Sequence, residues 1–349
     1  MFIPVAVGLE HVVPTQHLAI FAAAGLAILP LAGWMGRATE HLAARMGEGV
    51  GGLLNATFGN AAELIIALAA LRAGLHDVVK ASIVGSIVGN ILLVLGAAML
   101  AGGLRHREQR FNADGARTQA TMLTLAAIAL ILPAAYQEAV GAEGTPSLLW
   151  LSVGMSVVLL VVYGLFLTFS LRTHASLFSG SHAAEQEGEL QSVWTVRKAG
   201  LILALSTVAI AWMSEILVAA IQPASASIGL GTAFVAVFVV AILGNAAEHA
   251  TAITMAMKNR MDLSLSIAIG SSVQVALFVA PILVLVSLVL GPGPMDLAVQ
   301  GGFVLIVLLS VLITAQVASD GRSDWLKGVQ LLAVYLIFGL AYFFLPNPG

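Results

Sequence analysis

Ten long apolar stretches dominate this 349-residue sequence, and each is about as long as a helix that crosses a bilayer. Such a helix needs about 17–25 mainly apolar residues to span roughly 30 Å of hydrocarbon. Apolar residues make up 59% of the chain and charged residues 9%, whereas an ordinary soluble domain has about 25% charged residues. We therefore expect an integral membrane protein. The stretches run approximately over 16–36, 49–72, 78–102, 118–135, 147–171, 197–221, 230–256, 263–290, 297–317 and 324–345.

The stretches do not alternate in polarity, so they indicate helices rather than the strands of about 10 residues that build a closed barrel. The expected fold is an all-α membrane protein with ten transmembrane helices. The first stretch has no basic residue before it and no small-residue cleavage site after it, so we expect it to be retained rather than removed as a signal peptide. The chain has no cysteine, which excludes disulfides and thiol catalysis.

The positive charges predict the orientation of these helices. When the connectors are assigned alternately to two sides, Arg72 and Lys80 fall on one side and thirteen basic residues on the other. Lys and Arg are enriched in cytoplasmic loops, so the basic side is expected to be cytoplasmic and both termini outside. The thirteen are Arg37, Arg45, Arg105, Arg107, Arg110, Arg117, Arg172, Arg197, Lys198, Lys258, Arg260, Arg322 and Lys327.

The longest connector divides the chain into two similar halves. It covers about 172–196, after a short segment 1–15 and a first half 16–171, and before a second half 197–349. Because each half has five spans, the second half must enter the membrane in the opposite orientation, as in the inverted repeats of many secondary transporters. The connector is acidic and carries Glu185, Glu187 and Glu189. A solvated linker helix and a regulatory Ca²⁺ segment both fit this composition.

An acidic motif recurs in both halves. Residues 59–96 align without a gap to 244–281 with twelve identities in 38 positions, including an unbroken Gly-Asn-Ala-Ala-Glu that ends at Glu63 and at Glu248. Substrate sites of inverted-repeat transporters lie near the midplane at the repeat interface. We therefore expect the two glutamates to meet at one site.

Two buried carboxylates need a partner or a function. An Asp or Lys at the centre of a membrane helix costs about 2.5–3.5 kcal/mol on insertion scales, and a glutamate should cost a similar amount. A protonated structural glutamate is the alternative for one isolated residue, but two at symmetric positions favour function. Two protons or one divalent cation neutralise the pair equally well, and hard oxygen donors favour Ca²⁺ or Mn²⁺. The sequence thus predicts exchange of a dication for protons on Glu63 and Glu248.

Other polar residues are expected to support this pair. Gly59 and Gly244 lie one turn before the glutamates, where a glycine lets backbone carbonyls approach an ion. Asn60 and Asn245 share that face and either contact the ion or bond neighbouring helices. Serines in membrane helices are usually packing residues, so those in the partner spans are weaker candidates. The remaining candidates for the supporting shell are Ser86, Ser271, Ser272 and Gln274.

Three further residues are candidates for handling protons. Glu40 and Glu215 lie at similar places near the ends of the first spans of the two halves, although Glu40 also fits a position at the water interface. His249 follows Glu248, and imidazole titrates near physiological pH. Adjacent helical residues point about 100° apart, so a neutral, packed histidine remains the alternative.

The paired motifs resemble those of the cation/proton exchanger (CAX) family of the calcium/cation antiporter superfamily, in its bacterial form. The resemblance rests on GNAAELIIALAALRAG, GNAAEHATAITMAMKNR, GSIVGNILLVLG and GSSVQVALFVAP, and it extends from about residue 25 to the end. It implies Ca²⁺/H⁺ antiport in a bacterial inner membrane, with Glu63 and Glu248 alternately protonated and metal-bound, and with backbone oxygens of Gly59 and Gly244 at the ion. It also implies that the acidic connector senses cytoplasmic Ca²⁺. Many relatives have an extra first span, for which residues 1–15 are too short and too broken by Pro4 and Pro14.

Several alternatives stay open at this stage. The same site suits Mn²⁺, Na⁺ or K⁺ exchange for H⁺, and acidic residues also line cation channels. No HExxH or GxSxG motif supports an enzyme. No cofactor is expected besides the transported ions, and no partner besides the lipid bilayer; neither nucleic acid nor a protein partner is indicated, and homo-oligomer formation is left open.

Overall fold

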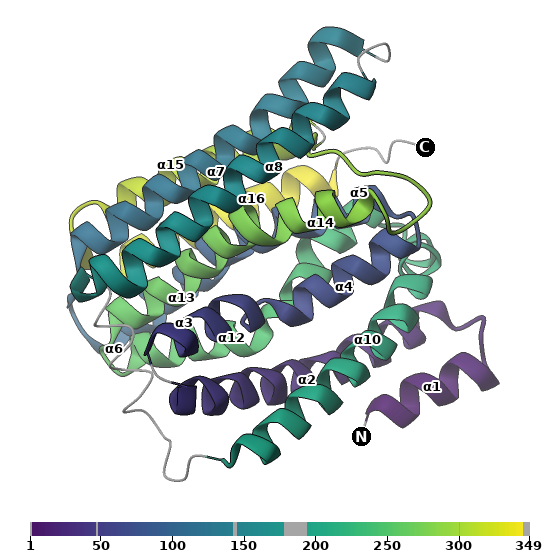
Figure 1. The fold of residues 1–349 in the computed structure, drawn as a ribbon, viewed down its shortest axis with the longest axis horizontal. Coiled ribbons are helices and arrows are strands. Elements are labelled where there is room, and N and C mark those ends of the chain that lie inside the picture. Colours follow the sequence, from purple (N-terminus) through teal and green to yellow (C-terminus); the bar gives the residue numbers. More distant parts are fainter. Residues whose placement is uncertain (1, 47, 142–144, 178–193, 300, 345–349) are drawn as a thin grey trace.

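The computed structural model describes residues 2–46, 48–141, 145–177, 194–299 and 301–344. Its regular elements are helices packed side by side, together with one two-residue β-ladder (Figure 1). The first half contains α1 (Phe2–Val12), α2 (His17–Met46), α3 (Glu48–Phe58), α4 (Ala61–Arg72), α5 (His76–Val88), the π-helical η1 (Gly89–Val94), α6 (Leu95–Arg105), β1 (Gln109–Arg110), α7 (Ala113–Val140), α8 (Thr145–Thr168), the π-helical η3 (Phe169–Thr173) and η4 (Ala175–Leu177).

The second half begins after the connector. It contains α10 (Val196–Ser227), α11 (Thr232–Val235), the π-helical η5 (Ala236–Val240), α12 (Ala241–Met257), α13 (Met261–Gln274), the π-helical η6 (Val275–Val279), α14 (Ala280–Ser287), α15 (Gly301–Ala318), β2 (Arg322–Ser323) and α16 (Trp325–Phe343).

Eight helical segments of the described chain are long and apolar enough to cross a membrane, which confirms a helical integral membrane protein. Two of the ten predicted stretches take a different form. The stretch 297–317 gives the shorter apolar helix α15. The stretch 49–72 is interrupted at Gly59 and Asn60, between α3 and α4. Gly and Asn are poor helix formers, which permits a break here without requiring one, and Asn60 leaves helical geometry at φ −98° and ψ 19°.

The segment before the first long helix is itself helical. α1 has 11 residues, which is too short for a span, as predicted for residues 1–15. Pro4 lies in its first turn, where the missing N–H costs no helical hydrogen bond, and Pro14 follows its end. Ala6 is fully buried, because α1 packs on α2.

Two π-helical segments occur at equivalent places in the halves. Residues 89–94 form η1, and the alignment of the two acidic motifs places them opposite 274–279, which includes η6. Pro281, predicted to break its span, lies just after η6 in the first turn of α14. Proline removes one helical hydrogen bond, and a π-turn accommodates such an irregularity, often at a functional site.

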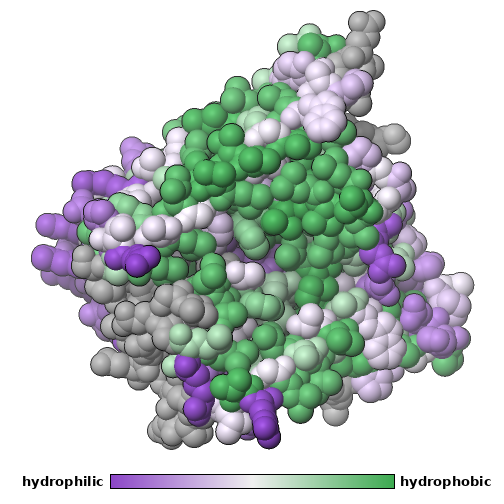
Figure 2. All heavy atoms as spheres, viewed as in Figure 1, coloured by the Kyte–Doolittle hydropathy of each residue, from purple (hydrophilic) through white to green (hydrophobic). Residues whose placement is uncertain are grey.

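The connectors at one end of the molecule are bonded together. β1 and β2 pair antiparallel, with Gln109 opposite Ser323, and Gln109 Nε2 donates to Ala256 O at 2.8 Å. We call this the basic end, formed by residues 37–46, 105–117, 172–177, 194–198, 257–262 and 319–327. Figure 2 shows hydrophobic side chains across the middle of one face and hydrophilic ones at its left and right edges. The apolar belt between two polar ends fits a bilayer.

Candidate functional site

The two copies of the acidic motif approach each other reciprocally. A Cβ added at Gly59 would lie 3.3 Å from Glu248 Oε1, and one added at Gly244 would lie 3.4 Å from Cα and Cβ of Glu63. Each motif's glycine therefore faces the other motif's glutamate. The two motifs lie against each other, and the missing side chain at Gly59 leaves room for the Glu248 carboxylate.

Glu63 is the buried carboxylate of the first copy. It is the third residue of α4, and only 6% of its surface is exposed. Ser86 of α5 and Asn245 of α12 lie beside it, yet neither carboxylate oxygen has a hydrogen-bond partner within the described residues. A buried carboxylate without partners is costly unless a proton or a cation neutralises it.

Glu248 lies in the interior of α12, because the second copy of the motif stays helical where the first is interrupted. Its Oε2 accepts a short hydrogen bond from Ser271 Oγ of α13. The Glu248 carboxylate is within electrostatic reach of Glu63. Ser86 and Ser271 are equivalent in the two halves, so each glutamate has the matching serine beside it.

The two motif asparagines connect the halves and differ in their partners. Asn60 Nδ2 donates a short hydrogen bond to Gln274 Oε1. Asn245 Nδ2 donates to Ser86 Oγ at 3.3 Å and to Ala241 O at 3.2 Å. The Oδ1 atoms of both asparagines are buried without a hydrogen-bond partner in the described chain.

The site is thus rich in oxygen acceptors that lack donors. Both Glu63 oxygens and the Oδ1 atoms of Asn60 and Asn245 are buried and unpaired among the described residues. Ca²⁺ takes 6–8 oxygen ligands from carboxylates, amide and backbone carbonyls and water. This donor set suits a hard cation, and protonation of the carboxylates satisfies part of the same set.

Two predicted residues point elsewhere. Ser272 Oγ donates to Ile87 O at 3.3 Å and to Ala268 O at 3.1 Å, so it bonds helix backbones rather than the carboxylates. Glu215 is exposed and pairs with Arg72 at 3.2 Å. Glu40 of α2 is exposed as well, but unlike Glu215 it lies within electrostatic reach of Glu248.

His249 contacts a residue that the sequence analysis did not single out. Its Nε2 lies 2.8 Å from Asn90 Oδ1 in η1, and Asn90 Nδ2 is buried with no partner in the described residues. Asn90 follows Ser86 by four residues and so lies on the same helical face. The four-residue spacing from Ser86 to Asn90 within GSIVGNILLVLG is the sequence signal that could have identified Asn90 as a site residue.

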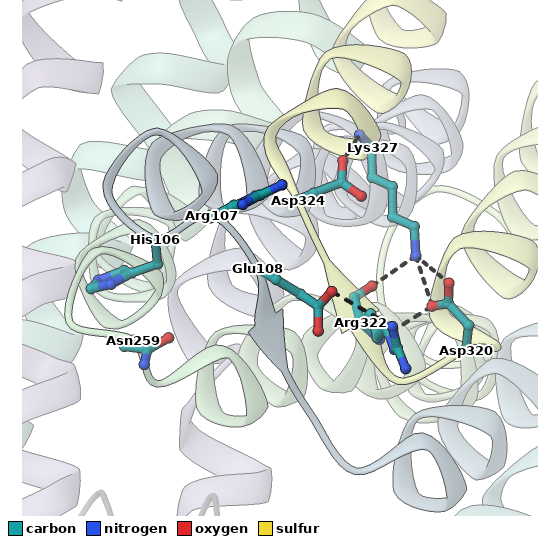
Figure 3. A pocket seen from close by; sticks show the side chains of 8 residues that line it. All are labelled: His106, Arg107, Glu108, Asn259, Asp320, Arg322, Asp324 and Lys327. Atoms are coloured by element: carbon teal, nitrogen blue, oxygen red, sulfur yellow. Dashed lines mark hydrogen bonds and ion pairs between the residues drawn. The ribbon is translucent and has the colours of Figure 1, made fainter.

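The described residues also line a polar cavity away from the two glutamates. It has a volume of about 900 Å³ and lies at the basic end between the connectors of the two halves (Figure 3). Lys327 Nζ donates to Asp320 at 2.7 Å, and Arg322 faces Glu108 at 3.6 Å. These opposite charges satisfy one another, so the cavity is best explained as a junction between the halves. The residues Glu185, Glu187 and Glu189 lie outside the described residues.

Helices of membrane-spanning length around a buried and a half-buried glutamate from a duplicated motif define a secondary transporter of cations. The chain belongs to the sodium/calcium exchanger protein family, which it matches over residues 16–172 and 198–344. This match, with the relatives below, confirms the resemblance seen in the motifs.

The chain is similar to three bacterial proteins over almost its full length. It is 46% identical to a Ca²⁺/H⁺ antiporter of Aphanothece halophytica, over 99% of this chain and 95% of that protein. It is 47% identical to a Ca²⁺/H⁺ antiporter of Synechocystis sp., over 94% and 91%. It is 41% identical to the Ca²⁺/H⁺ antiporter ChaA of Bacillus subtilis, over 93% and 92%.

Solved structures share the fold. The structure of native YfkE superposes with a TM-score of 0.83 at 37% identity, covering 98% of this chain and 97% of that one. The H⁺/Ca²⁺ exchanger CAX superposes with a TM-score of 0.64 at 15% identity, covering 97% and 88%, which shows a common fold alone.

Proposed function

We propose that this protein is a Ca²⁺/H⁺ antiporter in which Glu63 and Glu248 carry either Ca²⁺ or protons. The observation that supports this most is the reciprocal packing of Gly59 on Glu248 and of Gly244 on Glu63, which brings the buried Glu63 and the half-buried Glu248 to one site. Relatives that match nearly the whole chain are Ca²⁺/H⁺ antiporters.

Charge balance explains why such a site exchanges its ions. One Ca²⁺ or two protons leave the carboxylate pair with the same net charge, so neither loaded state strands a charge in hydrocarbon. The unpaired oxygens of Asn60 and Asn245 add neutral ligands for the cation. When protons replace it, the Ser271 hydroxyl continues to hold the Glu248 carboxyl group in place.

The architecture that goes with this function has ten crossings. We count α3 and α4 together as one broken crossing, and the shorter helix α15 as one unbroken crossing. Each of the inverted halves, 16–171 and 197–349, then has five crossings. The bonded connectors at the basic end support this alternation, because residues 106–112, 257–262 and 319–324 contact one another. By the positive-inside rule this end is cytoplasmic and both termini lie outside, in a bacterial inner membrane.

Glu40 is the proposed proton relay from the basic end. It lies on α2, and its charge reaches Glu248. Gly59, Gly244, Asn60, Asn245, Ser86 and Gln274 form the proposed supporting shell. His249, bonded to Asn90, holds α12 against η1 in this arrangement.

The test is Ca²⁺ uptake by proteoliposomes under an imposed pH gradient. We expect uptake coupled to proton release in the wild type and none with Glu63→Gln or Glu248→Gln. Glu215→Gln is the matched control, because this exposed glutamate pairs with Arg72 and should leave uptake intact. Absent Ca²⁺ flux, or full flux in both site variants, would contradict the proposal. Mn²⁺, Na⁺ and K⁺ in the same assay test other cations, and flux without proton movement would indicate a channel.

A further inference from the structure

A basic and aromatic patch lies where α2 and α10 meet at the basic end. We define it by Trp34, Arg37 and Arg45 of α2, and by Trp194 and Lys198 at the start of α10. Trp34 and Trp194 stack with ring centroids 6.0 Å apart. The Arg37 guanidinium lies 4.4 Å from the Trp34 ring, and Lys198 Nζ lies 4.7 Å from the Trp194 ring.

The buried His41 holds Trp194 of the patch in place. The His41 ring stacks on Trp194 at 4.3 Å, and its Nδ1 accepts from the Trp194 backbone N–H at 3.4 Å. Arg45 Nε donates to Trp194 O at 2.7 Å. The charges of Lys198, Arg37 and Arg45 all reach the His41 ring, whereas Glu40 is the carboxylate beside Arg37. Arg37, Arg45 and Lys198 thus surround the stacked rings of Trp34 and Trp194, a composition that suits an anion.

An apolar face leads to the patch along each helix. On α10, Leu201, Leu205 and Val208 are exposed by 61%, 61% and 68%, and their spacing places them on the same face as Lys198. On α2, Leu26 and Pro30 are exposed and precede Trp34 at helical spacing. In a bilayer these faces meet acyl chains, and the cations lie at the level of the headgroups.

We propose that this patch binds the headgroup of an anionic phospholipid of the cytoplasmic leaflet, with its acyl chains along α2 and α10. Tryptophans concentrate at membrane–water interfaces, and basic clusters between helices on the cytoplasmic side bind anionic headgroups. A dissolved phosphate ion would use the cations but not the adjoining apolar faces, which is why the lipid is the proposed ligand. The patch shares no residue with the site at Glu63 and Glu248.

The proposal is tested by tryptophan quenching in vesicles. The full chain, with Trp150, Trp212 and Trp325 changed to Phe so that Trp34 and Trp194 remain, is placed in phosphatidylcholine vesicles that contain some phosphatidylglycerol. Either lipid is brominated in turn. We expect brominated phosphatidylglycerol to quench far beyond its share of the lipid. Arg37→Gln with Lys198→Gln should lower this preference about 25-fold, at about 5-fold for each cation removed.

Controls separate the patch from general charge. Arg107→Gln with Arg110→Gln removes two cations from the same end and should leave the preference unchanged. Quenching by each brominated lipid in proportion to its share of the vesicle, or a preference that survives Arg37→Gln with Lys198→Gln, overturns the proposal. If the Phe background fails to fold, native mass spectrometry of the wild type with the two lipids gives the same comparison.

Two other occupants are outcomes of the same experiment. If inorganic phosphate abolishes the quenching, the patch binds soluble anions and the lipid proposal is wrong. If the preference appears only after Glu185, Glu187 and Glu189 are changed to Gln, the acidic connector of this chain is the occupant instead. We expect neither result, and the triple variant should match the wild type.

Discussion

Gly244 of α12 lies against the backbone of Glu63 in α4, so close that a Cβ at Gly244 would stand 3.4 Å from the Glu63 Cα and Cβ. The reverse relationship holds between Gly59 and the Glu248 carboxylate at 3.3 Å. Two helices that approach through glycines bring their backbones together. The approach of the two motifs is tightest at Gly59, where a side chain would crowd both the Glu248 carboxylate and the Asn55 carbonyl.

The two glycines should differ in their tolerance of alanine. At Gly59 a Cβ would also lie 2.8 Å from Asn55 O, which is backbone and cannot turn aside, whereas at Gly244 its nearest atoms lie at ordinary contact distance. We expect Gly59→Ala to destabilise by about 1–3 kcal/mol, as overpacking does, and to abolish most uptake. Gly244→Ala should retain most uptake. Both variants are compared with the wild type by thermal stability in detergent and by uptake into proteoliposomes. Equal effects of Gly59→Ala and Gly244→Ala would contradict the predicted difference.

The serine hydroxyls should also differ, although they are equivalent in the repeat. Ser271 donates to the Glu248 carboxylate, whereas Ser86 accepts from Asn245 at 3.3 Å. A hydrogen bond to a charged group contributes about 1.5–3 kcal/mol and a neutral one about 0.5–1.5 kcal/mol. We therefore expect Ser271→Ala to raise the Ca²⁺ concentration for half-maximal uptake more than Ser86→Ala does. Ser272→Ala is the control, since Ser272 bonds only backbone carbonyls in the described structure.

Hydrophobic length and the repeated motif were enough to predict the helical membrane fold and the meeting of Glu63 with Glu248. Local irregularity was harder to predict. The interruption at Gly59 and Asn60 occurs in the first copy of the motif, although the second copy has the same residues and stays helical. Identical pentapeptides with different structures show that packing against neighbouring helices decides the backbone here, rather than propensity.

The partners of side chains were harder still to predict. The repeated motif predicts equivalent partners for Asn60 and Asn245 in the two halves. The observed partners are not equivalent, because Asn60 donates to Gln274 and Asn245 donates to Ser86. The residue equivalent to Gln274 in the first half is Gly89, which has no side chain to accept such a bond. The position of Glu215 was equally hard to predict. It lies at the surface in an ion pair with Arg72 rather than near the two motif glutamates.

The bond between Asn60 and Gln274 connects α4's N-terminal turn with α13, one from each half. A double-mutant cycle with Asn60→Ala and Gln274→Ala measures its contribution. We expect the double variant to be less impaired than the two single effects combined, with a coupling of about 0.5–1.5 kcal/mol in stability. Additive effects would mean that the two side chains act separately. Gln119→Ala provides a control for the loss of a buried amide in another helix.

The ion pair at the basic end predicts a specific pH dependence. Partial burial of Asp320, which lies between α15 and α16, raises the pKa of its carboxyl group, but hydrogen bonds from Lys327 and from the Arg322 backbone N–H outweigh burial and lower that pKa below its ordinary value. A carboxyl group with a lowered folded-state pKa stabilises the fold above its unfolded pKa of about 3.9. This contribution is lost as pH falls through the lower, folded-state value.

We therefore expect Asp320→Asn to lower thermal stability at pH 7 and to have no effect in strong acid. The side chain of Asp320 is 53% exposed, so solvent screening limits the difference at pH 7 to below about 1 kcal/mol. Melting in detergent at pH 7, 5 and 3 follows the difference between variant and wild type, which should be constant down to about pH 5 and shrink below it. Asp114→Asn, at a more exposed pair with Arg117 at 3.5 Å, should show a smaller difference throughout. A difference that grows as pH falls would show that Lys327 does not hold Asp320 in its charged form.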